Sequence, residues 1–236
     1  MKIIVIGDIH GRTIWTEILY KENPDKVICL GDYVGSHEGI SGVQQIMNYR
    51  VLMDCKESEP DKFILLRGNH DMQHLGYYWA ECCSLNREVL EYFSNPENKE
   101  KFLKNTQWIH IDEDLKTIFS HAGVSEGWMK YYHIDDIYSI NDIKPSPEFG
   151  FTSNNYFDQC GESIIQPPTW IRPASLCESN IIGWDQVVGH TSVTRNIVNI
   201  HKTARKNQNI WLCDALALNQ YLIIENGEFK IGRLTN

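Results

Sequence analysis

Apolar runs that end in glycine and a polar side chain recur along this chain. The first three read KIIVIGDIHG, KVICLGD and KFILLRGNHD, and two later ones read KTIFSHAG and QVVGHT. Short apolar runs bounded by glycine predict buried strands. Helical patterns cover 12–21, about 39–57 and about 72–94. This alternation predicts an α/β fold whose first sheet is mainly parallel.

The second half of the chain reads differently. Asn226-Gly227 stands between two strand-like runs, which predicts a β-hairpin and an antiparallel pairing. Two packed sheets with flanking helices accommodate both halves. We expect residues 1–236 to form one domain. The segment from about 134 to 180 is rich in Pro, Ser, Asn and aromatic residues, and it predicts a long, lid-like loop.

The charge and the cysteines limit the classes of function. The formal net charge is −9, which argues against a broad nucleic-acid-binding face because phosphate backbones would be repelled. The apolar stretch at the N-terminus is too short for a signal peptide or a membrane helix. The seven cysteines are odd in number and irregularly spaced, which favours free thiols in the cytoplasm.

The polar residues at the predicted strand ends form a coherent donor set. In parallel α/β sheets ligands gather beyond the carboxyl ends of the strands. Two carboxylates, an amide oxygen and three imidazoles suit Mn, Fe, Zn or Ni better than Mg. Six ligands suit two ions, which together can clamp a phosphoryl oxygen and activate a water. The set comprises Asp8, His10, Asp32, Asn69, His121 and His190.

The series GDIHG, GDYVG, RGNHD, SHAG and VVGHT resembles the calcineurin-like metallophosphoesterase superfamily. It is most similar to the branch that holds Ser/Thr protein phosphatases, lambda-type phosphatases and symmetrical diadenosine tetraphosphatases. The motifs run from Gly7 to Thr191, which is most of the chain. The resemblance implies a four-layer α-β-β-α sandwich of two mixed sheets flanked by helices.

The resemblance also implies a role for each motif residue. Asp8 and His10 would bind the first metal, Asp32 would bridge both metals, and Asn69, His121 and His190 would bind the second. His70 would protonate the leaving oxygen, and Arg67 and Arg172 would hold the substrate phosphate. The implied reaction is direct attack by a metal-bridging hydroxide. Two divalent ions are expected, Mn²⁺ first and Fe, Zn, Ni or Mg as alternatives.

The stretch GDYVGSHEG departs from this pattern. Relatives carry an Asp that supports the catalytic His where this chain has Gly35, and a phosphate-binding Arg where it has Ser36. His37 or Glu38 could replace the missing carboxylate through a changed loop path. VVGHT ends in Ser192 where many phosphodiesterases carry a second His, which favours the phosphatase and tetraphosphatase branch.

The leading functional expectation is hydrolysis of phosphomonoesters in the manner of a Ser/Thr protein phosphatase. One alternative is hydrolysis of dinucleoside polyphosphates, so the substrate would be a phosphoprotein or a nucleotide. Another is a metal-bound scaffold with weak or no activity, which Gly35 and Ser36 support. His74 is interpreted as a helix-face residue, Asp214 as structural or as a support for a ligand, and the late-loop aromatics as loop anchors or stacking partners for a base.

Overall fold

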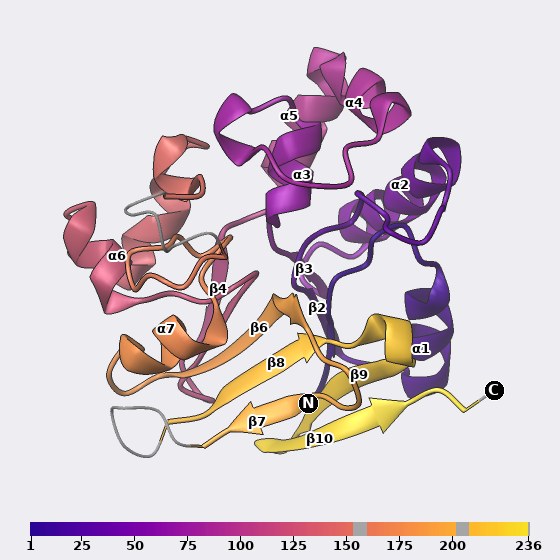
Figure 1. Ribbon diagram of the computed structural model, residues 1–236. Coiled ribbons are helices and arrows are strands. Elements are labelled where there is room, and N and C mark those ends of the chain that lie inside the picture. The colour runs from indigo at the N-terminus through magenta and orange to yellow at the C-terminus, as the bar shows by residue number, and fades with distance from the viewer. Residues whose placement is uncertain (153–159, 202–207, 236) are drawn as a thin grey trace.

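A computed structural model describes residues 1–152, 160–201 and 208–235 (Figure 1). The described residues form two five-stranded mixed sheets. The first has the order β10 (Glu228–Arg233), β9 (Gln220–Glu225), β1 (Lys2–Ile6), β2 (Lys26–Cys29) and β3 (Phe63–Leu65). The second has the order β4 (Ile109–Asp112), β5 (Thr117–Ser120), β6 (Asp185–Ser192), β8 (Ile210–Asp214) and β7 (Val198–Ile200).

The strand directions match the sequence pattern. β1, β2 and β3 run parallel, while β9 and β10 are antiparallel and joined by the predicted two-residue turn. Asn226 and Gly227 both have positive φ, at 53° and 79°, as a type I′ hairpin requires. In the second sheet β5, β6 and β8 are parallel and the two edge strands are antiparallel.

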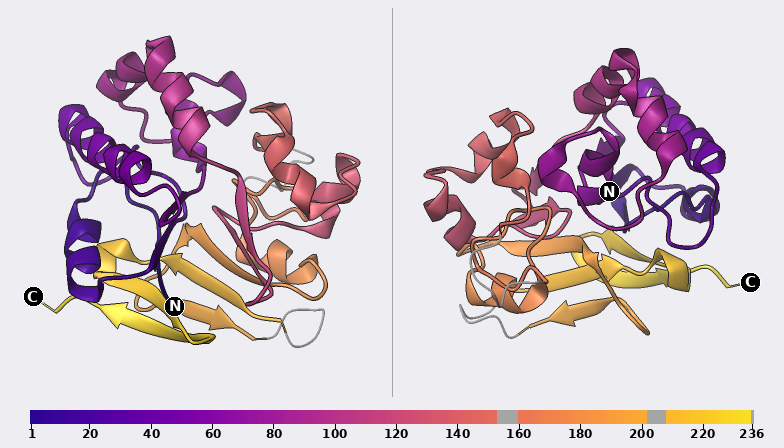
Figure 2. Two further views of the ribbon diagram at one scale, coloured as in Figure 1. Left: turned by 180° about the vertical axis from the view of Figure 1, so that it is seen from behind. Right: turned by 45° about the horizontal axis from the view of Figure 1, so that its top comes forward.

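Helices flank the two sheets, which confirms the predicted fold class. α1 and α2 lie beside the first sheet, and α6 and α7 lie beside the second (Figure 2). Their bounds are α1 (Ile14–Glu22), α2 (Gly42–Ser58), α3 (Asn69–His74), α4 (Arg87–Ser94), α5 (Pro96–Asn105), α6 (Glu126–Tyr131) and α7 (Pro173–Glu178), with 3-10 turns η1 (Tyr78–Ala80), η2 (Ile137–Asp142), η3 (Pro147–Phe149) and η4 (Leu216–Leu218). None of the helices in the described ranges has the length and apolar content needed to cross a bilayer.

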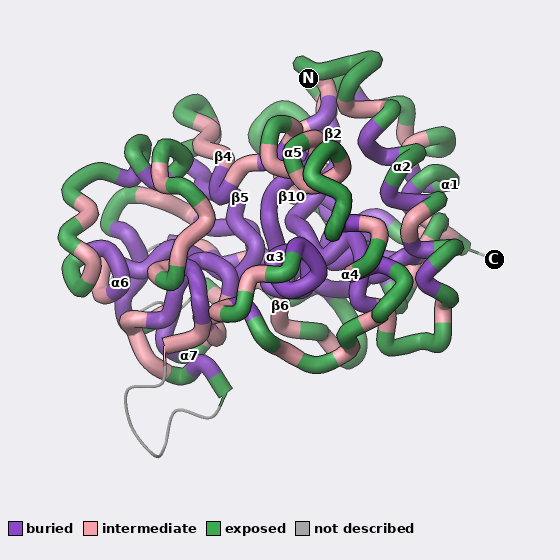
Figure 3. The backbone as a smooth tube through the Cα atoms, turned by 90° about the horizontal axis from the view of Figure 1, so that it is seen from above, coloured by how far each residue is buried: buried purple, intermediate pink, exposed green. Residues whose placement is uncertain are grey.

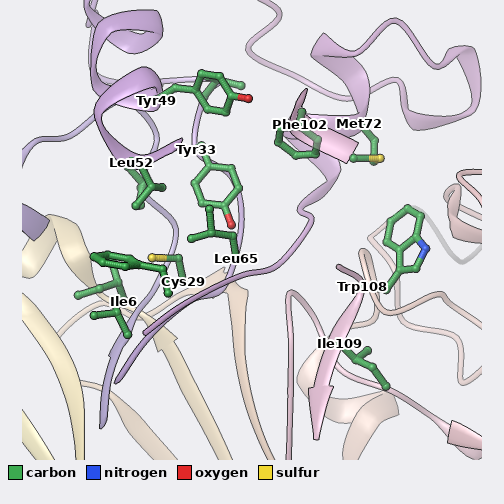
Figure 4. Packing of buried hydrophobic residues seen from close by; sticks show 14 of the residues in the cluster. Ile6, Cys29, Tyr33, Tyr49, Leu52, Leu65, Met72, Phe102, Trp108 and Ile109 are labelled. Carbon is green, nitrogen blue, oxygen red and sulfur yellow. The ribbon is translucent and has the colours of Figure 1, made fainter. Parts of the chain in front are cut away.

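The central strand β1 is buried on both faces. Ile3 and Val5 join the cluster between the two sheets, and Ile4 and Ile6 join the larger cluster under the helices. In Figure 4 Ile6 lies near Cys29 and below Leu52 of α2. Figure 3 shows the buried chain running through the centre of the molecule beneath exposed outer helix faces. An uninterrupted apolar run is therefore what this strand needs, since it has no solvent face.

The single helix expected over about 72–94 is wrong. The structure divides this region into α3, η1 and α4, with an irregular connection at 81–86. Gly76 adopts a φ of 78°, which ends the helix α3. The Asn86 side chain accepts a hydrogen bond from Val89 N and so caps the N-terminus of α4. The break carries Cys82 and Cys83 toward α3, where they lie beside the candidate site.

The segment 134–180 contains η2, η3 and α7 in its described part. Phe149 is buried and stacks on Trp108 with ring centroids 3.6 Å apart, so it anchors this segment rather than offering a surface to a ligand. Tyr156 and Phe157 lie outside the described residues. A lid-like role for the segment and a single domain over 1–236 stay predictions.

One half-buried histidine in the second sheet makes folding stability depend on pH. His110 of β4 buries Nε2 without a hydrogen-bond partner among the described residues. Burial, aided by the charge of Lys26, lowers the pKa of His110 to about 4. Its unfolded pKa is about 6.5, so the unfolded state binds more protons below that pH and stability is lost as the pH falls toward 4.

We therefore expect the free energy of unfolding to fall by about 2 kcal/mol more in the wild type than in His110→Gln between pH 7.5 and pH 5. Urea unfolding at the two pH values measures both free energies. An equal pH dependence in the two proteins would show that His110 protonates without cost in the folded state.

Candidate metal centre

A pocket of about 660 Å³ opens where the loops after β1, β2 and β3 meet β6. Five of the six residues predicted as metal ligands line it: Asp8, His10, Asp32, Asn69 and His190. The sixth, His121, follows β5 and is fully buried beside them. The structure thus brings together side chains that are up to 182 positions apart in sequence.

The chain reaches this pocket through a rarely used backbone conformation. His10, Asp32 and His190 have φ values of 47°, 50° and 58°, in the left-handed region that residues with a Cβ seldom adopt. Such conformations persist where surrounding contacts over-determine them and are concentrated at functional sites. Three of the six predicted ligands have this conformation, which is typical of residues at a functional site.

Gly189 explains why VVGHT needs its glycine. A Cβ built on Gly189 would lie 2.1 Å from Oδ1 of Asp8. The missing side chain lets the Asp8 carboxylate approach the backbone, where both its oxygens lie 3.1 Å from His190 N. The first and last motifs are therefore joined by a contact that only glycine permits.

Asp32 lies at the centre of the cluster. Its Oδ2 lies 3.4 Å from Nε2 of His121 and 3.8 Å from Nε2 of His10. Its Oδ1 accepts a hydrogen bond from His70 N at 2.9 Å, which fixes the carboxylate. Asp8, Asp32 and His121 each place a ligand atom within 4.8 Å of the others.

Asn69 links the remaining two histidines. Its Oδ1 lies 2.9 Å from Nε2 of His121 and 3.2 Å from Nδ1 of His190. At the opposite side of the ring, Nδ1 of His121 lies 2.9 Å from the carbonyl of Leu30. A carbonyl accepts from an N–H, so this contact places the proton on Nδ1 and leaves the lone pair of Nε2 facing the cluster.

His10 follows the same rule. Its Nδ1 lies 3.1 Å from the carbonyl of Val34, and its Nε2 faces Asp8 and Asp32. Burial lowers the pKa of both His10 and His121 to about 3, so both imidazoles are neutral near pH 7. Neutral imidazole is the form that binds metal ions.

The buried carboxylates show why a cation fits this site. Burial raises the pKa of Asp8 and Asp32 well above the usual range; Asp214 raises it further at Asp8, and Asp8 does so at Asp32. Two buried like charges are costly unless a cation compensates them. Carboxylate, amide and imidazole acceptor atoms converge around Asp8, Asp32 and His121, so the donor set present fits divalent metal ions.

Asp71 is a supporting residue that the sequence analysis missed. Its carboxylate accepts hydrogen bonds from the backbone N–H of Asp32, Tyr33 and Gly68 at 2.8 to 2.9 Å. It thereby fixes the loop after β2 against the start of α3. The signal was present as the final letter of RGNHD, directly after His70.

His70 lies in the pocket, and no carboxylate of the described residues pairs with its side chain. A Cβ on Gly35 would be only 2.7 Å from its Nδ1, so no larger side chain fits there as the loop stands. The Cys82 thiol is 3.6 Å from the same nitrogen. Gln45 of α2 holds the loop by accepting from the N–H of Gly35 at 2.8 Å. Burial lowers the pKa of His70 to about 3.

Glu38 is paired with Arg12. Both its carboxylate oxygens accept from Arg12, at 2.7 and 3.0 Å. The ring centroid of His37 lies 5.4 Å from that of His70. Arg12 lines the pocket and is a cation that the sequence analysis missed. Its position two residues after His10 is the signal that could have found it.

The two predicted phosphate-binding arginines have different surroundings. Arg67 is buried and donates to Oγ1 and the carbonyl of Thr106 and to the carbonyl of Leu103, with its guanidinium 4.7 Å above Trp108. It does not line the pocket among the described residues. In this placement the Arg67 guanidinium links the end of β3 to α5 and to Trp108, and a phosphate-binding role for Arg67 stays a prediction.

Arg172 does line the pocket. Its Nε donates to the carbonyl of Cys160, and its Nη1 donates to the carbonyl of His190 and to Thr191 Oγ1. These contacts, which come from the described residues, leave Nη2 as the donor for a ligand. Trp170 also lines the pocket, and its ring centroid lies 5.6 Å from that of His190. Asp214 also lines the pocket and accepts from Ser192 Oγ.

Comparisons with known proteins agree with this arrangement. The family model for the calcineurin-like phosphoesterases matches residues 1–221. The symmetrical bis(5'-nucleosyl)-tetraphosphatase of Erwinia tasmaniensis is 24% identical over 136 residues, which are 54% of this chain and 46% of that protein. A protein of Encephalitozoon cuniculi named "Probable serine/threonine-protein phosphatase" is 25% identical over 148 residues, 60% of this chain and 30% of that one. The chain spans less than half the length of these curated relatives.

Solved structures share the fold across the whole chain. The cold-active protein-tyrosine phosphatase of a Shewanella species superposes with a TM-score of 0.64 at 16% identity, covering 98% of this chain and 77% of that one. A protein serine/threonine phosphatase from Saccharomyces cerevisiae gives a TM-score of 0.59 at 12% identity, covering 100% and 81%.

Proposed function

Because the chain belongs to the calcineurin-like phosphoesterase family, we propose that it is a dinuclear-metal phosphoesterase that hydrolyses phosphomonoesters. The observation that carries the proposal is the convergence of the six predicted ligands around Asp32, five of them lining one pocket and His121 buried beside it. Asp8 and His10 would hold one ion, Asn69, His121 and His190 the other, and Asp32 both. Bound there, two divalent ions would polarise a phosphoryl oxygen and lower the pKa of a water.

The remaining pocket residues would handle the substrate and the proton. Nη2 of Arg172 donates to a phosphoryl oxygen, and its fixed Nε and Nη1 contacts keep the guanidinium in place. His70 would deliver a proton to the leaving oxygen: burial lowers its pKa to about 3, and the negative charge of a bound phosphate would raise that pKa. The His70 side chain is buried in the pocket wall, and the hydrogen bond from His70 N to Asp32 Oδ1 fixes the backbone at His70.

Substrate binding should depend on Arg172 and not on Arg67. A hydrogen bond to a charged group contributes about 1.5–3 kcal/mol, so Arg172→Gln is expected to raise KM by about 10- to 100-fold. Arg67→Gln should lower the melting temperature, because it leaves the Thr106 and Leu103 carbonyls without their donor, and should leave KM unchanged. Steady-state kinetics and thermal unfolding of the two variants test this pair. A raised KM in Arg67→Gln would restore it to the substrate site.

Hydrolysis of dinucleoside polyphosphates is the second candidate. A hollow of about 940 Å³ runs along α1 and α2 and shares Arg12 and Glu38 with the metal pocket. It offers room and apolar walls, including Met47 and Val51, for the part of a large substrate beyond the reacting phosphate. The tetraphosphatase relatives match this chain over 136 residues.

A substrate panel separates the candidates. The protein with Mn²⁺ is incubated with an aryl phosphate, a phosphoserine peptide, diadenosine tetraphosphate and a bis-aryl phosphodiester. We expect turnover of the first two in the leading model and preferential turnover of the third in the second model. Bound metal without turnover of any substrate would support the scaffold. All seven cysteines are free thiols, and we propose the cytoplasm as the compartment.

A further inference from the structure

A second cluster of metal-binding side chains lies at the edge of the catalytic pocket. His37, His70 and Cys83 place one ligand atom each within 4.8 Å of one another. They come from the loop after β2, from α3, and from the irregular connection between η1 and α4. None of the three belongs to the six-ligand set. We propose that they form a separate zinc site, and that Zn²⁺ bound there switches off proton delivery by His70.

The donor set favours zinc over the hard ions. Two imidazoles and one thiolate suit Zn²⁺, whereas Mg²⁺ and Mn²⁺ prefer oxygen ligands. Zn–N and Zn–S bonds of about 2.0 and 2.3 Å place tetrahedral ligand atoms about 3.3–3.6 Å apart. Side-chain shifts of about 1 Å would therefore close the three ligands around an ion, and water would complete the coordination.

The exposure and the contacts of His37, His70 and Cys83 favour binding of an ion. His37 and Cys83 are exposed and line the pocket, so an ion can reach them. Ser84 Oγ lies 2.5 Å from Nδ1 and 3.4 Å from Nε2 of His37, so the short contact is at Nδ1 and Nε2 is the ring nitrogen that we assign to the metal. The His37 and His70 rings meet edge to face at 84°. The absence of a side chain at Gly35 removes the group that would otherwise occupy the space against His70.

The consequence for catalysis follows from imidazole chemistry. A side chain that protonates a leaving oxygen needs a ring nitrogen that can reach that oxygen. A His70 ring that is held by zinc against His37 and Cys83 no longer offers that nitrogen to the substrate. Zinc binding thus stops proton delivery without touching the six-ligand set. This inhibitory consequence rests on the proposed function, whereas the binding of zinc does not.

Cobalt spectroscopy tests the binding independently of activity. The six-ligand set contains no sulfur, so a thiolate-to-cobalt charge-transfer band in the near ultraviolet reports cobalt bound outside that set. Titration of the Mn²⁺-loaded protein with Co²⁺ should produce this band in the wild type. The band should be lost in Cys83→Ser and weakened in His37→Asn. Cys82→Ser, which removes the neighbouring thiol, is the matched control and should retain it.

Inhibition is measured on the same proteins. With Mn²⁺ in excess, micromolar Zn²⁺ should inhibit the wild type, and Cys83→Ser should need at least 10-fold more Zn²⁺ while keeping its basal turnover. A wild type without the charge-transfer band, or a band lost in Cys82→Ser and kept in Cys83→Ser, would overturn the site. A band with no zinc inhibition of an active protein would overturn the switch only. A band in a protein without turnover would instead count against the proposed function.

Discussion

Replacing Asp32 by asparagine is expected to abolish phosphoester turnover in a protein that still folds. Asparagine keeps one oxygen to accept from His70 N, so the start of α3 stays in place. The new amide would point N–H groups toward His121 and His10 and would carry no charge. Loss of a supporting partner alone costs a metal site about 10- to 100-fold, so loss of this central ligand should cost more than about 100-fold in kcat.

The measurement pairs kcat with metal content and circular dichroism. Asp54→Asn, which removes an exposed carboxylate on α2, is the matched control and should retain metal and turnover. Wild-type turnover in Asp32→Asn would refute the assignment of Asp32 as the shared ligand.

Replacing His70 by asparagine should lower kcat by about 10²- to 10⁴-fold and leave the metal content unchanged. His70 lines the pocket but its side chain is outside the six-ligand set. A proton donor matters most when the leaving oxygen is strongly basic. The loss should therefore be larger for phenyl phosphate than for p-nitrophenyl phosphate, whose leaving group departs without help.

Metal analysis and kinetics with both substrates decide this prediction. His37→Asn removes the neighbouring imidazole, 5.4 Å away between ring centroids, and should show neither the loss nor the substrate dependence. An equal loss on both substrates would mean that His70 positions the substrate and is not the acid.

The sequence predicted the fold and the gathering of the six residues for one physical reason. Each residue follows an apolar run, and parallel strands end at one edge of a sheet. Local patterns of this kind need no knowledge of distant contacts. The positive φ angles at Asp32 and His190, by contrast, depend on neighbours that only the folded chain supplies.

Two features differ from the simplest interpretation of the sequence: the surroundings of Arg67 and the helix expected over 72–94. Arg67 turns from the pocket because Thr106 and Trp108, about 40 residues later, offer it acceptors and a ring. The helix expected over 72–94 breaks because Gly76 and Asn86 provide an end and a new start. Arg12 could have been found from its position two residues after His10, whereas its contact with Glu38 depends on the loop after β2.

GDYVGSHEG can now be described residue by residue. Asp32 is the centre of the ligand cluster, and Gly35 lies directly against His70. Glu38 pairs with Arg12, and His37 stands beside His70. The loop therefore lacks a carboxylate for His70 and offers an imidazole in its vicinity, which is the basis of the zinc site proposed above.

The most direct test is metal binding measured together with turnover. Metal-free protein is dialysed against increasing Mn²⁺, and bound manganese and phosphate release from an aryl phosphate are recorded at each concentration. We expect two ions per chain at saturation and turnover that appears as the second ion binds. Undiminished phosphate release by the metal-free protein in excess chelator would contradict a dinuclear-metal phosphoesterase.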